Sequence, residues 1–174
     1  MKHKIGVIGS AEGGTDEKLL NYARDMGREV AIHKCLLLTG ATTGLSYEAV
    51  KGAKEVGGFT VGFSPASDER EHIEKYKLPT EYFDFIVFTG HGYTGRTVPF
   101  IKSSDAIIGI AGNIGTLREY LTAFSEGKVT GVLSGSGGAS DIVIRDALEG
   151  KNGKKIFNSD PKLLVKEVIE SLSK

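Results

Sequence analysis

Residues 105–119 read DAIIGIAGNIGTLRE, and this stretch decides the fold. Its first part, Ala106 to Ala111, is a short and nearly unbroken apolar run, which is typical of a strand buried on both faces of a parallel sheet. A glycine-rich turn follows over residues 112–116, and a helical pattern begins at once. The apolar positions of that helix are Leu117, Tyr120, Leu121 and Phe124. The stretch therefore predicts a strand, a glycine turn and a helix in direct succession.

The start of this helix is suited to an anion. The first backbone N–H groups of a helix have no partner within it, and the helix dipole places partial positive charge at the same point. Gly112 and Gly115 allow a ligand to approach the backbone closely, and Thr116 adds a hydroxyl group. These residues favour a phosphate site over a purely structural turn. Glu119 lies one turn further on, where it either serves the same site or only offsets the dipole.

The rest of the chain alternates in the same way between apolar runs and segments with helical spacing. The expected strands cover residues 5–9, 35–39, 59–63, 85–88, 106–111, 128–133 and 155–157. Six helices are expected. One follows the capping residue Asp16, one covers residues 47–56, and a short one ends at residue 104. The others begin after the turn at residues 112–116, cover residues 140–148 and start at Pro161. This alternation predicts an α/β fold, with an open, mostly parallel sheet and helices on both faces, in a single domain over residues 1–174.

Ligands of such folds bind outside the carboxyl ends of the strands. We expect the glycine-rich turns after the first, second, fourth and fifth strands to gather at that edge, and the first of them spans residues 9–15. The charged segment 68–78 has alternating signs and predicts a surface loop or short helix with a solvated face. Cys35 lies in an apolar run, which indicates a buried small side chain rather than a nucleophile.

Composition excludes several classes of protein. The chain has 22 Lys and Arg and 22 Asp and Glu, so no net field favours nucleic acid or an acidic membrane. No apolar run approaches the ~20 residues needed to span a bilayer. A single cysteine fits a reducing cytoplasm, and the four scattered histidines have no metal-ligand spacing. We expect a cytoplasmic protein without a metal site, with a small phosphorylated ligand as its partner.

The sequence does not support a dinucleotide site, a P-loop or a nucleophile elbow. Residues 90–95 match G-x-G-x-x-G, but they follow the fourth strand, and the next strand ends without the carboxylate that binds a ribose, so a nicotinamide site is not expected. The chain contains no G-x-x-x-x-G-K-[ST] motif. Ser134 and Ser136 lack the glycine two positions earlier that a nucleophile elbow requires. His91 is either a polar contact of the ligand or a solvated loop residue.

Arg96 stands in the glycine-rich segment after the fourth strand. Its forked, permanently charged guanidinium suits a phosphate or an electron-rich ring, whereas it cannot readily act as a general acid. Position alone leaves a ligand contact and an exposed loop arginine equally open.

Residues 112–119, GNIGTLRE, resemble the P-G-G-x-G-T-x-x-E motif of the LOG-type cytokinin-activating phosphoribohydrolases, also called lysine decarboxylase-like proteins. Arg96 lies nine residues before Asp105, the spacing at which that family carries its catalytic arginine. The segments 5–10 and 38–53 resemble the family's first and second glycine turns. The similarity covers most of the chain and extends to the molybdenum-cofactor carrier-like proteins, which share the same Rossmann-like SLOG fold.

The resemblance implies hydrolysis of the N-glycosidic bond of a nucleoside 5′-monophosphate to free base and ribose 5-phosphate. Arg96 and Glu119 would then be catalytic, with Glu119 beside the ribose and Arg96 assisting the departing base. The residues implied in phosphate or nucleotide binding are Gly9, Ser10, Gly40, Thr42, Gly112, Asn113, Gly115 and Thr116. No cofactor is required, and a homo-oligomer, a dimer or a tetramer, is expected.

Two departures keep a second function open. Ala111-Gly112-Asn113 replaces Pro-Gly-Gly, which puts a side chain where the phosphate approaches, although asparagine tolerates left-handed backbone angles. The family's Met-His-Glu-Arg-Lys run around the arginine is also replaced, by residues 92–97. The alternative is a non-catalytic carrier or sensor of a nucleotide or of a pterin-type ligand such as molybdopterin.

Overall fold

The computed structural model describes residues 2–11, 16–145 and 153–172. In this part of the chain seven strands form one sheet in the order β4-β3-β2-β1-β5-β6-β7, and every neighbouring pair is parallel. The strands are β1 (Lys4–Gly9), β2 (Leu36–Thr39), β3 (Thr60–Ser64), β4 (Phe85–Phe88), β5 (Ala106–Ile110), β6 (Val129–Leu133) and β7 (Lys155–Asn158). The helices are α1 (Glu17–Ile32), α2 (Leu45–Glu55), α3 (Glu69–Glu74), α4 (Gly92–Gly95), α5 (Thr97–Ser103), α6 (Ile114–Ser125), α7 (Gly138–Arg145) and α8 (Pro161–Leu172). The predicted α/β fold is confirmed.

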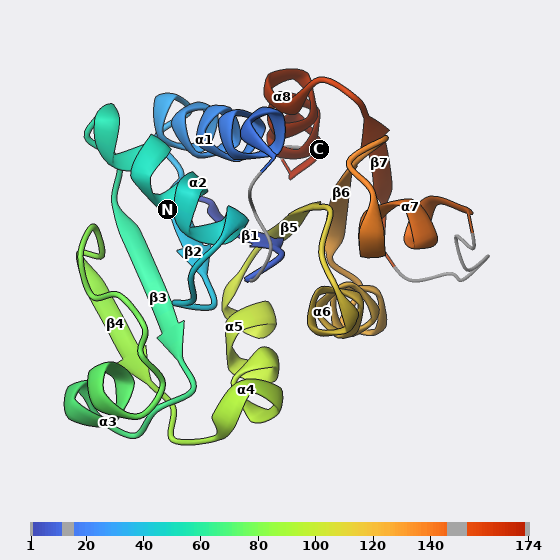
Figure 1. Ribbon diagram of the computed structural model, residues 1–174. Helices are drawn as coiled ribbons and strands as arrows, with labels where there is room; N and C mark the ends of the chain where they lie inside the picture. The colour runs from blue at the N-terminus through green and yellow to red at the C-terminus, as the bar shows by residue number, and fades with distance from the viewer. Residues whose placement is uncertain (1, 12–15, 146–152, 173–174) are drawn as a thin grey trace.

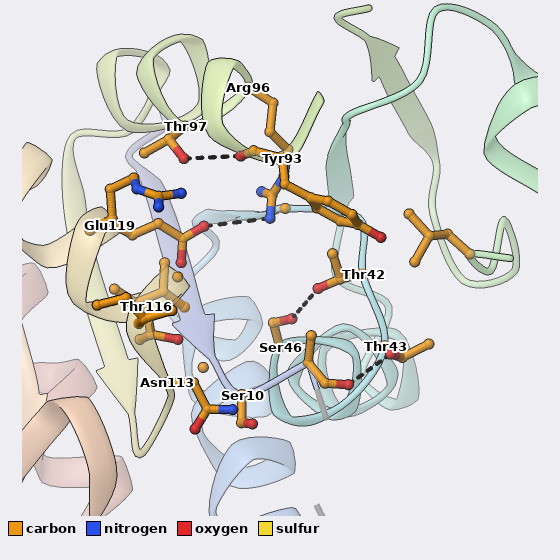
Figure 2. Close-up of a pocket in the computed structure, with 18 of the residues that line it drawn as sticks. Ser10, Thr42, Thr43, Ser46, Tyr93, Arg96, Thr97, Asn113, Thr116 and Glu119 are labelled. Carbon is orange, nitrogen blue, oxygen red and sulfur yellow. Dashed lines mark hydrogen bonds and ion pairs between the residues drawn. The ribbon is translucent and has the colours of Figure 1, made fainter. Parts of the chain in front are cut away.

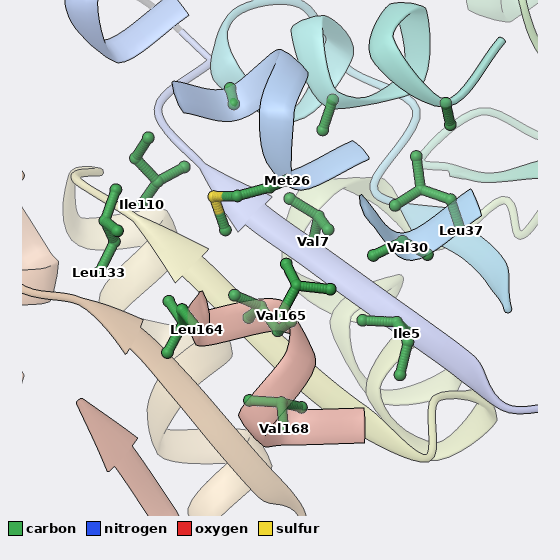
Figure 3. Packing of buried hydrophobic residues seen from close by; sticks show 14 of the residues in the cluster. Ile5, Val7, Met26, Val30, Leu37, Ile110, Leu133, Leu164, Val165 and Val168 are labelled. Carbon is green, nitrogen blue, oxygen red and sulfur yellow. The ribbon is translucent and has the colours of Figure 1, made fainter. Parts of the chain in front are cut away.

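Helices cover both faces of the sheet (Figure 1). Helices α1, α2 and α8 pack on one face, where Met26, Val30 and Val165 meet Ile5 and Val7 of β1 (Figure 3). Helices α5, α6 and α7 pack on the other face, around a second cluster of buried side chains. Because neighbouring residues of a strand point to opposite faces, the apolar runs in the sequence supply both clusters at once.

Strand β5 illustrates this division. Ile108 belongs to the cluster under α1 and α8, and Ile107 to the cluster under α5 and α6. Neither side chain is exposed to solvent. Full burial of such a side chain stabilises the fold by about 1.5–3 kcal/mol, so a central strand of this composition requires cover on both sides.

Three helices begin at an aspartate that caps them. Asp16 accepts a hydrogen bond from the N–H of Lys18, and Asp68 accepts one from the N–H of Glu71. Asp160 accepts from the N–H groups of both Lys162 and Leu163. The start signals at Asp16 and before Pro161 are therefore confirmed, with Pro161 as the first residue of α8.

The charges of the segment 68–78 predict a solvated face, but part of this segment is buried. His72 is fully buried, with Nδ1 at 2.8 Å from the hydroxyl of Ser64 and Nε2 at 3.0 Å from the carbonyl of Pro79. Leu78 is buried as well. The charged side chains around His72 point outward, but this single residue anchors the segment to β3, an effect that charge alternation alone does not reveal.

Smaller corrections concern the ends of the elements. Residues 92–95 form a helical turn rather than a loop. Cys35 precedes β2, and it is buried as predicted, with a thiol pKa that burial raises. The expected glycine turn at residues 12–15 and the end of the helix expected to reach residue 148 lie outside the described residues.

The strand order reverses its direction between β1 and β5. From β1 the chain builds β2, β3 and β4 outward in one direction, and then returns to place β5, β6 and β7 on the other side of β1. The loops after β1 and β5 therefore diverge to opposite faces, which leaves a crevice at the carboxyl ends of these two strands.

Candidate functional site

A cavity of about 520 Å³ opens at this crevice. Its volume lies within the range of about 300–1,000 Å³ that is usual for sites of small ligands. Segments that follow β1, β2, β4 and β5 line it, together with residues 76–78. The lining residues are Val7, Ile8, Gly9, Ser10, Ala11, Gly40, Thr42, Thr43, Ser46, Tyr76, Lys77, Leu78, Tyr93, Arg96, Thr97, Asn113, Ile114, Gly115, Thr116, Arg118 and Glu119. The expected gathering of four turns at one edge is confirmed.

The turn after β5 has an unusual backbone. Ala111 and Gly112 have positive φ angles of 49° and 98°, whereas Asn113 has an extended backbone with φ of −110°. Proline is restricted to φ near −65°, so the turn could not form in this way with the family's proline at position 111. Asn113 therefore does not adopt the left-handed backbone that asparagine tolerates, because Ala111 and Gly112 make the turn.

Two serines hold this turn, Ser136 from the segment before α7 and Ser140 from within α7. The Ser136 hydroxyl accepts a hydrogen bond from the N–H of Ala111 at 2.8 Å, and the Ser140 hydroxyl donates to the Ala111 carbonyl at 3.1 Å. The N–H of Ala139 donates to the carbonyl of Gly112 at 2.8 Å. Ser136 is buried, so its role is to fix the backbone that leads into α6.

The N-terminus of α6 faces the cavity without a capping side chain. Asn113 is the N-cap residue, and its side chain makes no capping hydrogen bond. The first hydrogen bond of the helix runs from the N–H of Leu117 to the carbonyl of Asn113, so the N–H groups of residues 114–116 precede the helical ladder. A Cβ atom at Gly115 would meet no other atom within 4 Å. The protein leaves open the donors and the space that an anion requires.

A buried ion pair lies deeper in the same cavity (Figure 2). Nη2 of Arg96 lies 3.5 Å from Oε1 of Glu119, and both side chains are about nine-tenths buried. The guanidinium rests on Gly40, where a Cβ atom would come within 1.8 Å of Nη1. Nε and Nη1 of Arg96 are buried and have no hydrogen-bond partner among the described residues. Arg96 is therefore not the exposed loop arginine that its position left open.

Burial governs the electrostatics of this pair. Removal from water raises the pKa of Glu119 above its ordinary value, and the positive charge of Arg96 offsets only part of this effect. The same cause lowers the pKa of Arg96. Glu119 is the sixth residue of α6, and no acidic residue lies in the first turn. Its alternative role of offsetting the helix dipole therefore does not fit, because that effect falls off within the first turn.

Hydroxyl groups form the opposite wall. The side-chain oxygens of Thr42 and Ser46 lie 3.3 Å apart, and both residues are buried. Thr43 donates to the carbonyl of Ala11 at 2.8 Å, which ties the turn after β2 to the turn after β1. Helix α2 also begins here without a side-chain cap, at Gly44. The wall therefore offers polar groups without any charge.

Most of the predicted site residues lie together. Nine of the ten line the cavity, namely Gly9, Ser10, Gly40, Thr42, Arg96, Asn113, Gly115, Thr116 and Glu119. Gly112 does not line the cavity, because its positive φ and its close contact with the Thr116 side chain serve the turn itself. His91 does not line it either.

Several lining residues were not predicted. Tyr93 lies within the G-x-G-x-x-G match, which was examined only as a dinucleotide motif. Tyr76, Lys77 and Leu78 come from the segment expected to be a solvated face. Arg118 lies next to Glu119, and its Nη1 donates to the Thr94 hydroxyl at 3.0 Å, which links α6 to α4. An aromatic residue between glycines at the ligand edge is the signal that could have identified Tyr93.

The described residues offer neither a metal site nor a membrane span. No group of three or more His, Cys, Asp or Glu side chains in residues 2–11, 16–145 and 153–172 is arranged to hold a metal ion. No described helix combines the length and apolar character needed to cross a bilayer.

Comparison with known proteins identifies the family. A family model described as the SLOG cluster4 family matches residues 2–165. The chain belongs to this family. An uncharacterized protein from Archaeoglobus fulgidus is 34% identical over 125 residues, which are 72% of this chain and 76% of that relative. The predicted SLOG/LOG-like superfamily is thereby confirmed.

Two solved structures are similar over the whole length of this SLOG chain. The molybdenum cofactor binding protein of the phototrophic bacterium Rippkaea orientalis has a TM-score of 0.83 and 27% identity, covering 100% of this chain and 99% of that one. The molybdenum cofactor carrier protein of Chlamydomonas reinhardtii has a TM-score of 0.81 and 26% identity, covering 100% of both chains. The SLOG fold of this chain is thus shared with proteins that bind or carry a molybdenum cofactor.

Proposed function

We propose that the cavity binds a small phosphorylated heterocyclic compound of the molybdopterin type, and that the protein carries this compound without changing it chemically. The observation that carries the proposal is the uncapped N-terminus of α6 in the cavity wall. Its N–H groups and dipole favour a phosphate, and the open space at Gly115 allows the close approach that such a contact needs.

The charges in the cavity favour an anionic ligand. Arg96, Arg118 and Lys77 line it, against Glu119 as the single carboxylate among the described lining residues. Two guanidinium nitrogens of Arg96 lack partners, and an unsatisfied buried donor costs about 1–3 kcal/mol. A bound anion offsets part of that cost. A pterin phosphate combines the required charge with a planar heterocycle.

Retention of the ligand is favoured over its hydrolysis by the groups at hand. Glu119 is already paired with Arg96, and its raised pKa weakens it as a negative charge. No His, Asp or Cys lies among the described lining residues to protonate a departing base. Glycoside hydrolysis usually employs two carboxyl groups, one of them as the acid.

The buried pair itself favours a second function. A carboxylate and a guanidinium held 3.5 Å apart at the bottom of a phosphate-binding cavity suit the N-glycosidic hydrolysis of a nucleoside 5′-monophosphate. Glu119 would then stabilise the positive charge that develops on the ribose, and Arg96 would bind the departing base. The two functions differ in whether the ligand leaves intact.

One experiment separates them. The purified protein is titrated with molybdopterin and with a panel of nucleoside 5′-monophosphates, and the compounds are recovered and identified by mass spectrometry. Tight binding of molybdopterin with unchanged recovery supports the carrier. Release of a free base that is lost in Glu119→Gln supports the hydrolase. If none of these compounds binds, both functions are wrong.

A matched pair of variants locates the binding site. Thr116→Ala removes a hydroxyl group at the N-terminus of α6. Affinity for the phosphate compound should fall roughly tenfold, which is the loss expected for one hydrogen bond to a charged group. Thr122→Ala removes an exposed hydroxyl group from the same helix, where it bonds only the backbone of Arg118. This control should bind as the unchanged protein does.

A further inference from the structure

Tyr93 is an aromatic side chain held open at the wall of the cavity. It is 48% exposed, and it lies within a helix of only four residues, α4. The ring of Tyr76 stands against it at a centroid distance of 5.3 Å and an interplanar angle of 89°. Both residues line the cavity. In Figure 2 the ring of Tyr93 lies across the pocket from Asn113 and Thr116, with the ion pair between the two sides.

Hydrogen bonds hold the two segments that carry Tyr93 and Tyr76. The Thr97 hydroxyl donates to the carbonyl of Tyr93 at 3.4 Å, and Arg118 of α6 donates to Thr94 in the same short helix. Tyr76 belongs to the segment that the buried His72 anchors, since the N–H of Leu78 donates to the carbonyl of His72 at 3.1 Å. These contacts hold the two segments that place Tyr76 and Tyr93 together on the cavity wall.

We infer that Tyr93 is the stacking platform for the heterocycle of the ligand, supported from the side by Tyr76. The inference rests on the proposed function, because it assumes that the phosphate binds at the N-terminus of α6. With the phosphate there, the ring of a pterin or purine extends past the Arg96–Glu119 pair toward Tyr93. The 48% exposure of Tyr93 and its place on the cavity wall make its ring accessible to a ligand there. The ligand class is then a phosphate ester that carries a planar aromatic ring. Sugar phosphates without an aromatic ring bind only through the phosphate.

The molecule contains a similar pair of tyrosines outside the cavity. Tyr82 is 49% exposed and stands against Tyr47 at 6.1 Å and 62°. Neither residue lines the cavity. Tyr82 and Tyr93 are thus equally exposed, and each contacts a second tyrosine, but they differ in location and in backbone, since Tyr82 has a positive φ of 65°. Tyr82 is therefore the matched control for Tyr93.

The test compares ligands with and without the ring. The affinities of guanosine 5′-monophosphate, a dihydropterin phosphate and ribose 5-phosphate are measured by calorimetry for the unchanged protein and for Tyr93→Phe, Tyr93→Leu and Tyr82→Leu. Guanine shares the aminopyrimidinone ring of a pterin. We expect Tyr93→Leu to weaken the ring-bearing ligands about tenfold, within the range of base stacking on an aromatic side chain, and to change ribose 5-phosphate less than twofold. Tyr93→Phe keeps the aromatic face and should bind as the unchanged protein does, as should Tyr82→Leu.

The outcomes distinguish this inference from the proposed function. If Tyr93→Leu weakens all three compounds equally, Tyr93 only positions its surroundings and the inference is wrong. If it weakens none of them while the unchanged protein binds a ring-bearing compound, the inference is also wrong but the proposed function stands. If the unchanged protein binds none of the three, both fail. The thermal unfolding of each variant is recorded to confirm that it folds.

Discussion

The N-termini of α8 and α6 solve the same physical problem in opposite ways. At α8, Asp160 accepts two backbone hydrogen bonds, so that the protein satisfies the helix by itself. At α6, the N-cap side chain makes no such bond, and the first residues face a cavity. The acidic residue of α6, Glu119, lies beyond the first turn and is paired with Arg96 instead. The comparison teaches that a helix start left unsatisfied at a crevice is a candidate for binding, whereas a capped one is structural.

The largest expected effect comes from removing the positive partner of Glu119. Arg96→Met leaves a carboxyl group buried without its ion-pair partner, which should lower the free energy of unfolding by about 3 kcal/mol at neutral pH. The pKa of Glu119 is already raised by burial, so the native state holds this proton more tightly than the unfolded state. The loss should therefore shrink as the pH falls toward the ordinary range of a glutamate and grow as the pH rises.

Urea unfolding at several pH values measures this effect. The double variant Arg96→Met/Glu119→Gln is the control, because it buries no charge and should recover much of the lost stability at neutral pH. A loss that is the same at every pH, or that the second substitution does not reduce, would contradict the assignment of a buried pair whose acid is destabilised by desolvation.

The second effect follows from giving α6 the cap that α8 has. Asn113→Asp places a carboxylate at the N-cap, where it accepts backbone N–H groups and complements the dipole. The free protein should become more stable by about 0.3–1 kcal/mol, because the new negative charge complements the helix dipole. Affinity for a phosphate compound should fall by about 2 kcal/mol, roughly 30-fold, because the carboxylate repels the phosphate and competes for its donors. Calorimetric titration and thermal unfolding measure the two quantities on the same sample. An affinity that stays unchanged would remove the N-terminus of α6 from the site.

The converse substitution tests the structural helix start. Asp160→Ala removes both hydrogen bonds at α8 and should lower the free energy of unfolding by about 1 kcal/mol. Ligand affinity should not change, because Asp160 does not line the cavity. Denaturant unfolding together with a binding titration checks both parts. A change in affinity would show that the two helix starts are coupled.

The smallest effect concerns Gly115, whose missing side chain nothing in the described protein requires. Gly115→Ala should stabilise the free protein by about 0.5 kcal/mol, because alanine loses less backbone entropy in a helix. The added methyl group enters the space proposed for the phosphate, so affinity should fall severalfold. Opposite changes in stability and affinity are the expected signature, and a rise in both would contradict the proposed position of the phosphate.

Local patterns were sufficient for much of this molecule. The caps at Asp16 and Asp160 and the succession of strand, turn and helix after residue 105 all follow from residues that are neighbours in the sequence. The strand ends at Ile110 rather than at residue 111, and the helix begins at Ile114 rather than after residue 116, because the backbone turns already at Ala111 and Gly112. The rule that parallel strands present their carboxyl ends at one edge was enough to gather nine of ten candidate residues. It could not distinguish Gly115, which faces open space, from Gly112, which packs on Thr116, because both are glycines in the same turn.

The amino-acid sequence by itself therefore determined the order of strands and helices, the sheet edge that carries the cavity and the polar groups available there. Only the tertiary structure decided that Arg96 is buried on Gly40 beside Glu119, that His72 anchors a charged segment, and that Tyr76 meets Tyr93. The physical reason is that burial, pairing and desolvation here depend on contacts between residues eight or more positions apart in the chain, whereas propensity, capping and periodicity act over a few residues.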